Sequence, residues 1–362
     1  MRMTVAFPLL AMMLLVATCT SSPPPLPLIL GYNVESATVS VAKIDPVTNL
    51  AIPISPSCSS LPAPAQWNYR PQYFDETDVV TSAVPIPSSS SSSDDGETTK
   101  LAYLVAGGTM VATVGYTNGT NACTVSTLGL SETISSPVGV GYDASMGGLV
   151  VLAYDSEGGG SGSNNYFEML FVSLSSGAVK SLSGGEILLD QYMLFPITMG
   201  IYDESGVFFF ALDNGEVVAF NQTSITGLTP TRDPPSVFDW YTTAGSLFYN
   251  PANGGSYQAL YGSAYQYDAE AQGIANLVVD FPQQTYSLSQ PRELSFGPSV
   301  PQCGRALFSQ DYMYAVCYNL GVGTLTYNNF VYVFPRAINP DNNVPSVYEV
   351  TNLSSILYLF PF

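Results

Sequence analysis

Acidic residues carry most of the chemistry that this sequence offers. Carboxylates recur near aromatic residues in the segments that separate predicted strands between residues 155 and 270. Two carboxylates can supply an acid and a base for glycosidic bond cleavage, carboxylate oxygens bind calcium, and an aromatic ring stacks on a sugar. The alternative is that these side chains only solubilise a surface of low charge. The candidate binding residues are Asp155, Glu157, Asp190, Asp233, Asp239, Trp240, Tyr265, Asp268 and Glu270.

The 362-residue sequence contains no histidine. This excludes Ser-His-Asp and Cys-His nucleophilic catalysis, proton transfer by histidine and every metal site with a histidine ligand. Carboxylate, lysine or tyrosine chemistry and calcium bound through oxygen remain open, as does the absence of any catalysis. We therefore assign no catalytic residue and no cofactor, and calcium is the only metal ion kept as a candidate.

Charged residues make up only 10% of the chain, and 28 acidic against 9 basic residues give a net charge of −19. A typical soluble protein is about 25% charged. A composition poor in Glu, Lys and Arg favours β-structure over helices. The negative charge disfavours nucleic acids and anionic membrane surfaces as partners. We expect an extracellular protein or glycan partner instead.

The first 19 residues have the features of a cleaved secretory signal peptide. Arg2 precedes an apolar run that is shorter than the roughly 20 residues needed to span a bilayer. Small residues, Ala17 and Cys19, precede the expected cleavage point. The alternative is a bacterial lipoprotein anchored to the membrane through Cys19. The apolar stretch at 356–362 is too short for an anchor, so no transmembrane segment is predicted.

Residues 20–27 form a Pro-rich leader, which we predict to be an extended spacer. One β domain is predicted to cover residues 28–362, with a Pro/Ser/Cys linker at 56–71 and a Ser-rich loop at 85–99. Its six-serine run is followed by Asp94-Asp95-Gly96-Glu97. The alternating oxygen ligands of a calcium loop are missing there, so we interpret the loop as solvated.

Four cysteines remain after Cys19 is removed, and they allow three pairings. Cys303 and Cys317 lie at mirror positions in a predicted hairpin, where a cross-strand disulfide is geometrically reasonable. Cys58 and Cys123 would then pair with each other and tie the N-terminal segment to the second repeated unit. Buried free thiols are the alternative, although extracellular thiols tend to oxidise.

The stretch from Pro137 to Leu182 is the clearest copy of a repeated unit. It contains two β-runs around a Gly-containing turn, a Gly/Ser loop, and two more β-runs around Ser-Ser-Gly. A four-stranded antiparallel meander of this size is the unit of a β-propeller blade. A second strong hairpin signal is Asp213-Asn214-Gly215 between two apolar runs.

Counting such units predicts the architecture. Three strands at the N-terminus and one at the C-terminus are left over, and together they complete a further blade with the last strand innermost. We predict an all-β fold, a single β-propeller of six four-stranded blades closed by pairing of the N- and C-terminal strands. β-Sandwich domains are the alternative. The five internal units are predicted near residues 72–133, 137–183, 186–230, 236–290 and 294–350.

Through its Tyr-Asp-x-x-x-Gly hairpins and four-strand spacing, the chain resembles secreted β-propeller proteins over roughly residues 28–360. It lacks the Trp-Asp signature of WD repeats, the combination of a Gly-Gly pair with spaced aromatics that marks kelch repeats, and the Asp-box of sialidases. The resemblance therefore carries over no functional residue.

Asp143 and Asp203 repeat with these hairpins, and we interpret them as structural. In a propeller they would lie in the turn between the first and second strands, where Asp bonds its own backbone. The loops between second and third strands, and the connections between blades, share the opposite face and hold the candidate binding residues.

Three Asn-x-Ser/Thr acceptors for N-glycosylation begin at Asn118, Asn221 and Asn352. Asn118 and Asn221 fall in predicted turns and are the better candidates. We expect a secreted, non-enzymatic propeller that recognises a protein or glycan, or contributes to a surface coat. The rival hypothesis is a carboxylate-dependent secreted enzyme, either a glycoside hydrolase or a calcium-dependent lyase or lactonase.

Overall fold

The structure is a computed structural model in which almost all regular elements are β-strands. Two 3₁₀ helices, η1 (Pro56–Cys58) and η2 (Asn118–Thr120), lie among the described residues. No helix in this part of the chain has the length and apolar character needed to cross a bilayer. The structure describes residues 24–69, 77–80, 83–87, 98–155, 166–184, 187–188, 201–202, 207–211, 217–221, 224–230, 246–250, 256–262, 272–280, 283–288, 292–294, 302–309, 311–319, 328–335 and 346–360.

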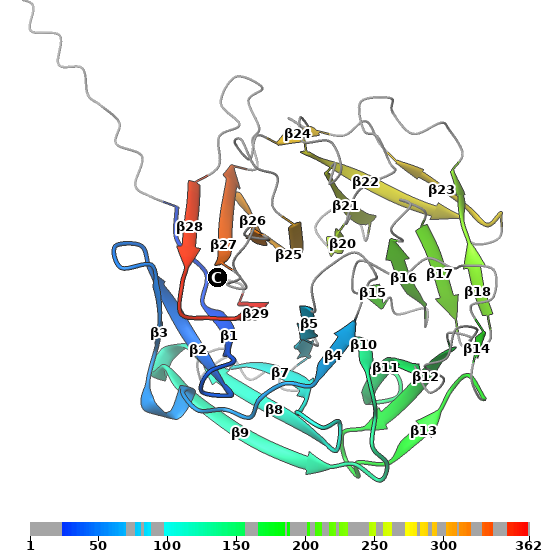
Figure 1. The fold of residues 1–362 in the computed structure, drawn as a ribbon, viewed down its shortest axis with the longest axis horizontal. Coiled ribbons are helices and arrows are strands. Elements are labelled where there is room, and N and C mark those ends of the chain that lie inside the picture. Colours follow the sequence, from blue (N-terminus) through cyan, green and yellow to red (C-terminus); the bar gives the residue numbers. More distant parts are fainter. Residues whose placement is uncertain are drawn as a thin grey trace, which may run out of the picture.

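The sheets stand side by side around a ring (Figure 1), and within the described residues six of them contain a four-stranded antiparallel meander. The first has the order β29-β1-β2-β3, with β29 (Ser355–Leu359), β1 (Ile29–Asn33), β2 (Thr38–Asp45) and β3 (Leu50–Pro53). The second comprises β6 (Val84–Ile86), β7 (Thr98–Leu104), β8 (Met110–Thr117) and β9 (Ala122–Gly129). The third comprises β10 (Pro137–Asp143), β11 (Gly148–Asp155), β12 (Tyr166–Ser173) and β13 (Val179–Ser181), with β14 (Ile187–Leu188) also paired to β12.

The remaining sheets follow the same order. The fourth comprises β15 (Ile201–Tyr202), β16 (Phe208–Ala211), β17 (Val217–Asn221) and β18 (Ser224–Gly227). The fifth comprises β20 (Ser246–Asn250), β21 (Ser256–Gly262), β22 (Gln272–Asp280) and β23 (Thr285–Leu288), joined by β19 (Thr229–Pro230) and β24 (Arg292–Leu294). The sixth comprises β25 (Gln302–Phe308), β26 (Tyr312–Asn319), β27 (Asn328–Pro335) and β28 (Ser346–Val350).

The all-β, propeller-like expectation is confirmed at this level. The meander predicted at 137–182 is present as β10 to β13, and β16 pairs with β17 across Asp213-Asn214-Gly215. The C-terminal strand β29 pairs antiparallel with β1 and is the first strand of the N-terminal sheet. Segments more than 300 residues apart therefore share one sheet.

Two boundaries differ from the sequence prediction. The second four-stranded unit begins at β6, not near residue 72, and the expected linker before it contains β4 (Gln66–Tyr69), which pairs with β5 (Thr77–Val80) as a separate hairpin. The Ser-rich loop predicted at 85–99 loses its ends to β6 and β7. Residues 88–97 lie outside the described residues.

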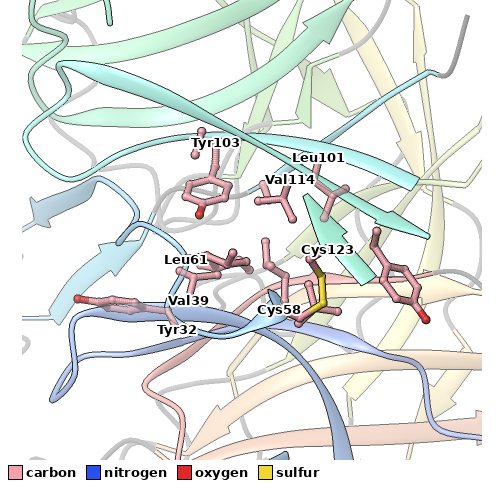
Figure 2. Close-up of a cluster of buried hydrophobic side chains, with 14 of the residues drawn as sticks. Tyr32, Val39, Cys58, Leu61, Leu101, Tyr103, Val114 and Cys123 are labelled. Atoms are coloured by element: carbon pink, nitrogen blue, oxygen red, sulfur yellow. A yellow bond between two sulfur atoms is a disulfide. The ribbon is translucent and has the colours of Figure 1, made fainter. Parts of the chain in front are cut away.

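Apolar side chains fill the spaces between adjacent sheets. One cluster joins the first and second sheets through Leu30, Val41, Tyr103 and Leu357. Figure 2 labels Tyr103 and other members of this cluster, among them Val39 and Leu101. A second cluster joins the first and sixth sheets, and a third joins the second and third sheets. This face-to-face burial is the main stabilising contribution in the described part of the fold.

A disulfide between Cys58 and Cys123 crosses the junction of the first two sheets (Figure 2), with a Cα–Cα distance of 5.0 Å. It links η1, directly after the N-terminal sheet, to β9, as predicted. Cys303 and Cys317 are direct partners in the β25–β26 register. Their disulfide remains a prediction, supported by a backbone pairing that suits a cross-strand bridge.

The sequence prediction missed a hydrogen bond that recurs around the rim. A residue that follows the outer strand of one sheet donates its N–H to the turn before the outer strand of the next. The three donor–acceptor distances are 2.9 Å for Ser131 N to Gly177 O, 2.9 Å for Thr229 N to Gln284 O and 3.0 Å for Thr351 N to Asn49 O. We call these the rim contacts.

The three acceptor residues share a left-handed backbone. Their φ angles are 72° for Gly177, 53° for Gln284 and 59° for Asn49. Asn121, next to the Cys58–Cys123 disulfide, has φ 50° at the equivalent place in the second sheet. A left-handed residue reverses the chain tightly, and in three of these turns its carbonyl accepts the rim contact from the preceding sheet.

The end of the Pro-rich leader is part of the fold rather than a free spacer. Pro27 is buried, and Leu26 packs against the cluster between the first and sixth sheets. The Tyr314 hydroxyl of β26 donates to the Pro25 carbonyl at 2.9 Å. Burial raises the pKa of Tyr314 to about 12.

Tyr314→Phe tests this contact. At neutral pH we expect a loss of about 1 kcal/mol of unfolding free energy, because the Pro25 carbonyl loses its donor. The folded state holds the phenol proton more tightly than the unfolded chain, so stability from this group is complete below about pH 10 and falls between about pH 10 and 12. The free energy of unfolding, measured with urea, should therefore fall less between pH 7 and pH 11 in Tyr314→Phe than in the wild type. Equal losses would contradict the contact.

Candidate functional site

Among the candidate binding residues, Asp155 lies within the described part of the chain. It ends β11 and pairs with Tyr166, the first residue of β12, so it borders the loop between the second and third strands as predicted. The N–H of the preceding Tyr154 donates to Ser136 O at 3.0 Å. The connection from the second sheet therefore reaches the third at the end where β11 finishes.

Tyr154 itself is a packing residue. Its ring centroid lies 5.4 Å from that of Phe167, which in turn lies 6.2 Å from Phe220 of the fourth sheet. This aromatic chain joins the third and fourth sheets, so the half-buried Tyr154 ring packs at the junction between them. The other candidates lie outside the described residues: Glu157, Asp190, Asp233, Asp239, Trp240, Tyr265, Asp268 and Glu270.

The structural interpretation of Asp143 is confirmed. Its Oδ1 accepts hydrogen bonds from Ser145 N at 2.8 Å, Met146 N at 3.0 Å and Ser145 Oγ at 2.6 Å. The carboxylate thus closes its own β10–β11 turn. Asp203 lies outside the described residues.

The β4–β5 hairpin is the functional candidate that sequence reasoning missed. It is inserted between the outer strand of the first sheet and the first strand of the second, and Figure 1 shows it inside the ring, toward the centre from β7, β8 and β9. It packs next to β10. Its sequence signal was an alternation at Gln66-Trp67-Asn68-Tyr69, hidden by the prolines on both sides.

The base of the hairpin is held firmly. Leu61 and Val39 exchange backbone hydrogen bonds of 2.9 and 3.0 Å, and Ala65 N donates to Leu104 O at 2.7 Å. The buried Tyr103 hydroxyl donates to Pro62 O at 2.9 Å, and burial raises the pKa of Tyr103. The segment that leads into β4 is thereby fixed to both flanking sheets.

The hairpin register sorts its residues between two faces. Trp67 pairs with Val79 and Tyr69 with Thr77, so these four positions share one face. Gln66, Asn68, Asp78 and Val80 occupy the other. An isolated two-stranded hairpin is marginally stable in water, so this one depends on its anchored base.

The three glycosylation acceptors occupy different surroundings. Asn118 begins η2 and is exposed. Asn221 ends β17, is exposed and pairs in register with Ser224. Asn352 is half-buried, and both atoms of its side-chain amide bond the backbone of Ala51.

The described residues hold no group of three or more His, Cys, Asp or Glu side chains placed to bind a metal ion. No protein-family model matches the chain, and no curated protein matches it. Solved structures do show similarity at low sequence identity. The fold is β-propeller-like.

Three similar structures illustrate the range. A proposed 6-phosphogluconolactonase from Bacteroides uniformis aligns with a TM-score of 0.44 and 11% identity, covering 92% of this chain and 98% of that one. The WD40 domain of SCAP from fission yeast aligns at 0.32 and 10%, covering 75% and 66%. The C-terminal WD40 domain of Sif2 aligns at 0.35 and 9%, covering 78% and 86%. At these scores none of them assigns an activity to this chain.

Proposed function

We propose that this chain is an extracellular, non-enzymatic propeller of six four-stranded blades that binds a protein or glycan partner or contributes to a surface coat. The six meanders and the β1–β29 pairing support the blade count. The Cys58–Cys123 disulfide supports an oxidising compartment. The proposal includes cleavage of the first 19 residues, a Cys303–Cys317 disulfide, and glycans at Asn118 and Asn221.

The observation that carries the binding role is the β4–β5 hairpin. It interrupts the four-strand pattern and projects into the ring from a connection between two sheets. Insertions in propellers and other repeat folds map to loops, and often to the binding face. An inserted hairpin on an anchored base is a means of presenting a few side chains without disturbing the blades.

Shortening the hairpin tests this role. Gln66 and Val80 are direct partners in the register, so residues 67–79 can be replaced by Gly-Gly without moving the flanking strands. We expect this variant to lose binding to the ligand of the wild-type protein, measured first on an array of immobilised glycans and then against extracellular protein fractions. Its thermal unfolding midpoint should stay close to that of the wild type.

A matched control replaces the Ser-rich segment 88–97 with a Gly-Ser linker of equal length, and it should bind as the wild type does. The proposal fails if both variants bind alike. It also fails if the purified protein hydrolyses chromogenic glycosides or a lactone, with or without calcium, and Asp155→Ala or Asp268→Ala abolishes turnover. That result would establish the carboxylate-dependent enzyme.

A further inference from the structure

The acceptor sequence Asn352-Leu353-Ser354 lies in the short connection between β28 and β29. β28 is the outer strand of the sixth sheet, and β29 is the strand that pairs with β1. All three residues take part in joining the two ends of the described fold. This distinguishes the sequence from the exposed acceptor at Asn118.

Asn352 continues the edge of the first sheet with its side chain. Its Oδ1 accepts a hydrogen bond from Ala51 N at 2.8 Å, and its Nδ2 donates to Ala51 O at 2.8 Å. Asn33 Nδ2 donates to the backbone carbonyl of Asn352 at 2.9 Å. The amide therefore occupies the open edge of β3, next to the rim contact between Thr351 and Asn49.

Leu353 and Ser354 are equally engaged. Leu353 is 6% exposed, it lies in the cluster between the first and sixth sheets, and its carbonyl accepts a hydrogen bond from the buried Asn329 amide at 2.8 Å. Ser354 Oγ accepts from Val34 N at 2.9 Å, and its own N–H donates to Tyr32 O at 2.8 Å.

Glycosylation of Asn352 would replace the Nδ2 hydrogen that it donates to Ala51 O. Glycosylation joins Nδ2 to C1 of a sugar carried on a polyprenyl pyrophosphate; the sugar–phosphate bond breaks, the lipid pyrophosphate leaves, and Nδ2 gives up one proton. A substituted amide is planar and trans, so the sugar carbon lies on the same side of the C–N bond as Oδ1. Both bonds to Ala51 need the hydrogen on that side.

We propose that glycosylation of Asn352 and closure of the sheet by β29 exclude each other. The acceptor is open only before β29 pairs with β1, so its occupancy reports how fast the two ends of the fold join. Once the connection has docked, Asn352-Leu353-Ser354 holds β29 to the first sheet and is no longer an acceptor.

The test expresses the full chain in a eukaryotic secretory host and measures occupancy at Asn352 and Asn118 by site-resolved mass spectrometry after enzymatic deglycosylation. Two variants delay closure without altering the acceptor. Gly31→Val forces the Leu353 side chain to move, because even a Cβ at position 31 would overlap it. Asn33→Ala removes the hydrogen bond to the Asn352 carbonyl and is the milder change.

The matched control is Gly148→Val, which crowds Phe171 and the Val172 carbonyl in the third sheet, away from the β28–β29 connection. In the secreted wild type we expect Asn352 to be far less occupied than Asn118. Gly31→Val and Asn33→Ala should raise Asn352 occupancy severalfold, with Asn118 unchanged. The proposal is overturned if folded wild-type protein carries a glycan at Asn352 as often as at Asn118. It is also overturned if Gly148→Val raises occupancy as much as the closure variants do.

Discussion

Replacing Cys58 and Cys123 together by alanine should lower the free energy of unfolding by about 4 kcal/mol. The disulfide closes a loop of 65 residues, and its removal gives the unfolded chain more conformational freedom. The loss should appear as a lower urea midpoint under non-reducing conditions, and a reductant should lower the wild-type midpoint further than this, because it also opens the predicted Cys303–Cys317 disulfide.

The second cysteine pair provides the comparison. Cys303→Ala with Cys317→Ala opens a much shorter loop, so we expect a loss of about 3 kcal/mol if that disulfide is present. A digest of the non-reduced protein should show Cys58 linked to Cys123. A peptide that links Cys58 to Cys303 or Cys317 would refute the pairing.

Leu357→Ala should cost about 3 kcal/mol of unfolding free energy. Leu357 is fully buried in β29, within the cluster between the first and second sheets. Truncation leaves a cavity that the surrounding strands can fill only in part. The effect should be measured by urea unfolding followed by tryptophan fluorescence.

Val125→Ala is the matched control, because Val125 is 48% exposed on the outer strand β9. A surface truncation of this kind is expected to stay within about 0.5 kcal/mol of the wild type. If the two substitutions have the same effect, β29 does not contribute the buried contact on which closure of the first sheet depends.

The repeated architecture was predictable because, in all but the first sheet, the four strands of the meander follow one another in the sequence. Alternating apolar residues and Gly, Asn or Asp turns mark antiparallel neighbours, so Pro137–Leu182 sufficed to define the unit. Even the long-range pairing of β29 with β1 followed from counting, because three strands and one strand were left unpaired.

Contacts between sheets were not predictable in the same way. The rim contacts use backbone carbonyls of Asn49, Gly177 and Gln284, and three different residue types give no shared sequence signal. The docking of Leu26 and Pro25 depends on the shape of the sixth sheet, which is far away in sequence. Trp67 and Tyr69 were assigned to a linker because the flanking prolines outweighed a short alternation.

The candidate site was predicted less completely than the fold. Loops lack the periodic pattern that defines strands. The sequence therefore predicts which strands a loop connects, but not the path of its backbone. Asp155 is attached where we expected it, at the end of β11. Its role, and that of the other candidate carboxylates, stays a prediction for binding and turnover measurements.

Because β29 pairs with β1, the chain could begin at another connection and still form the same sheets in the same order. The first sheet is assembled from both ends of the described chain, and each other meander is a continuous segment. Circular permutation is tolerated where the original ends lie close together and the new ends fall at an exposed connection. A chain that begins at β6 and runs through β29 directly into β1 would contain the same neighbouring pairs of strands, with the first sheet now written as one uninterrupted meander.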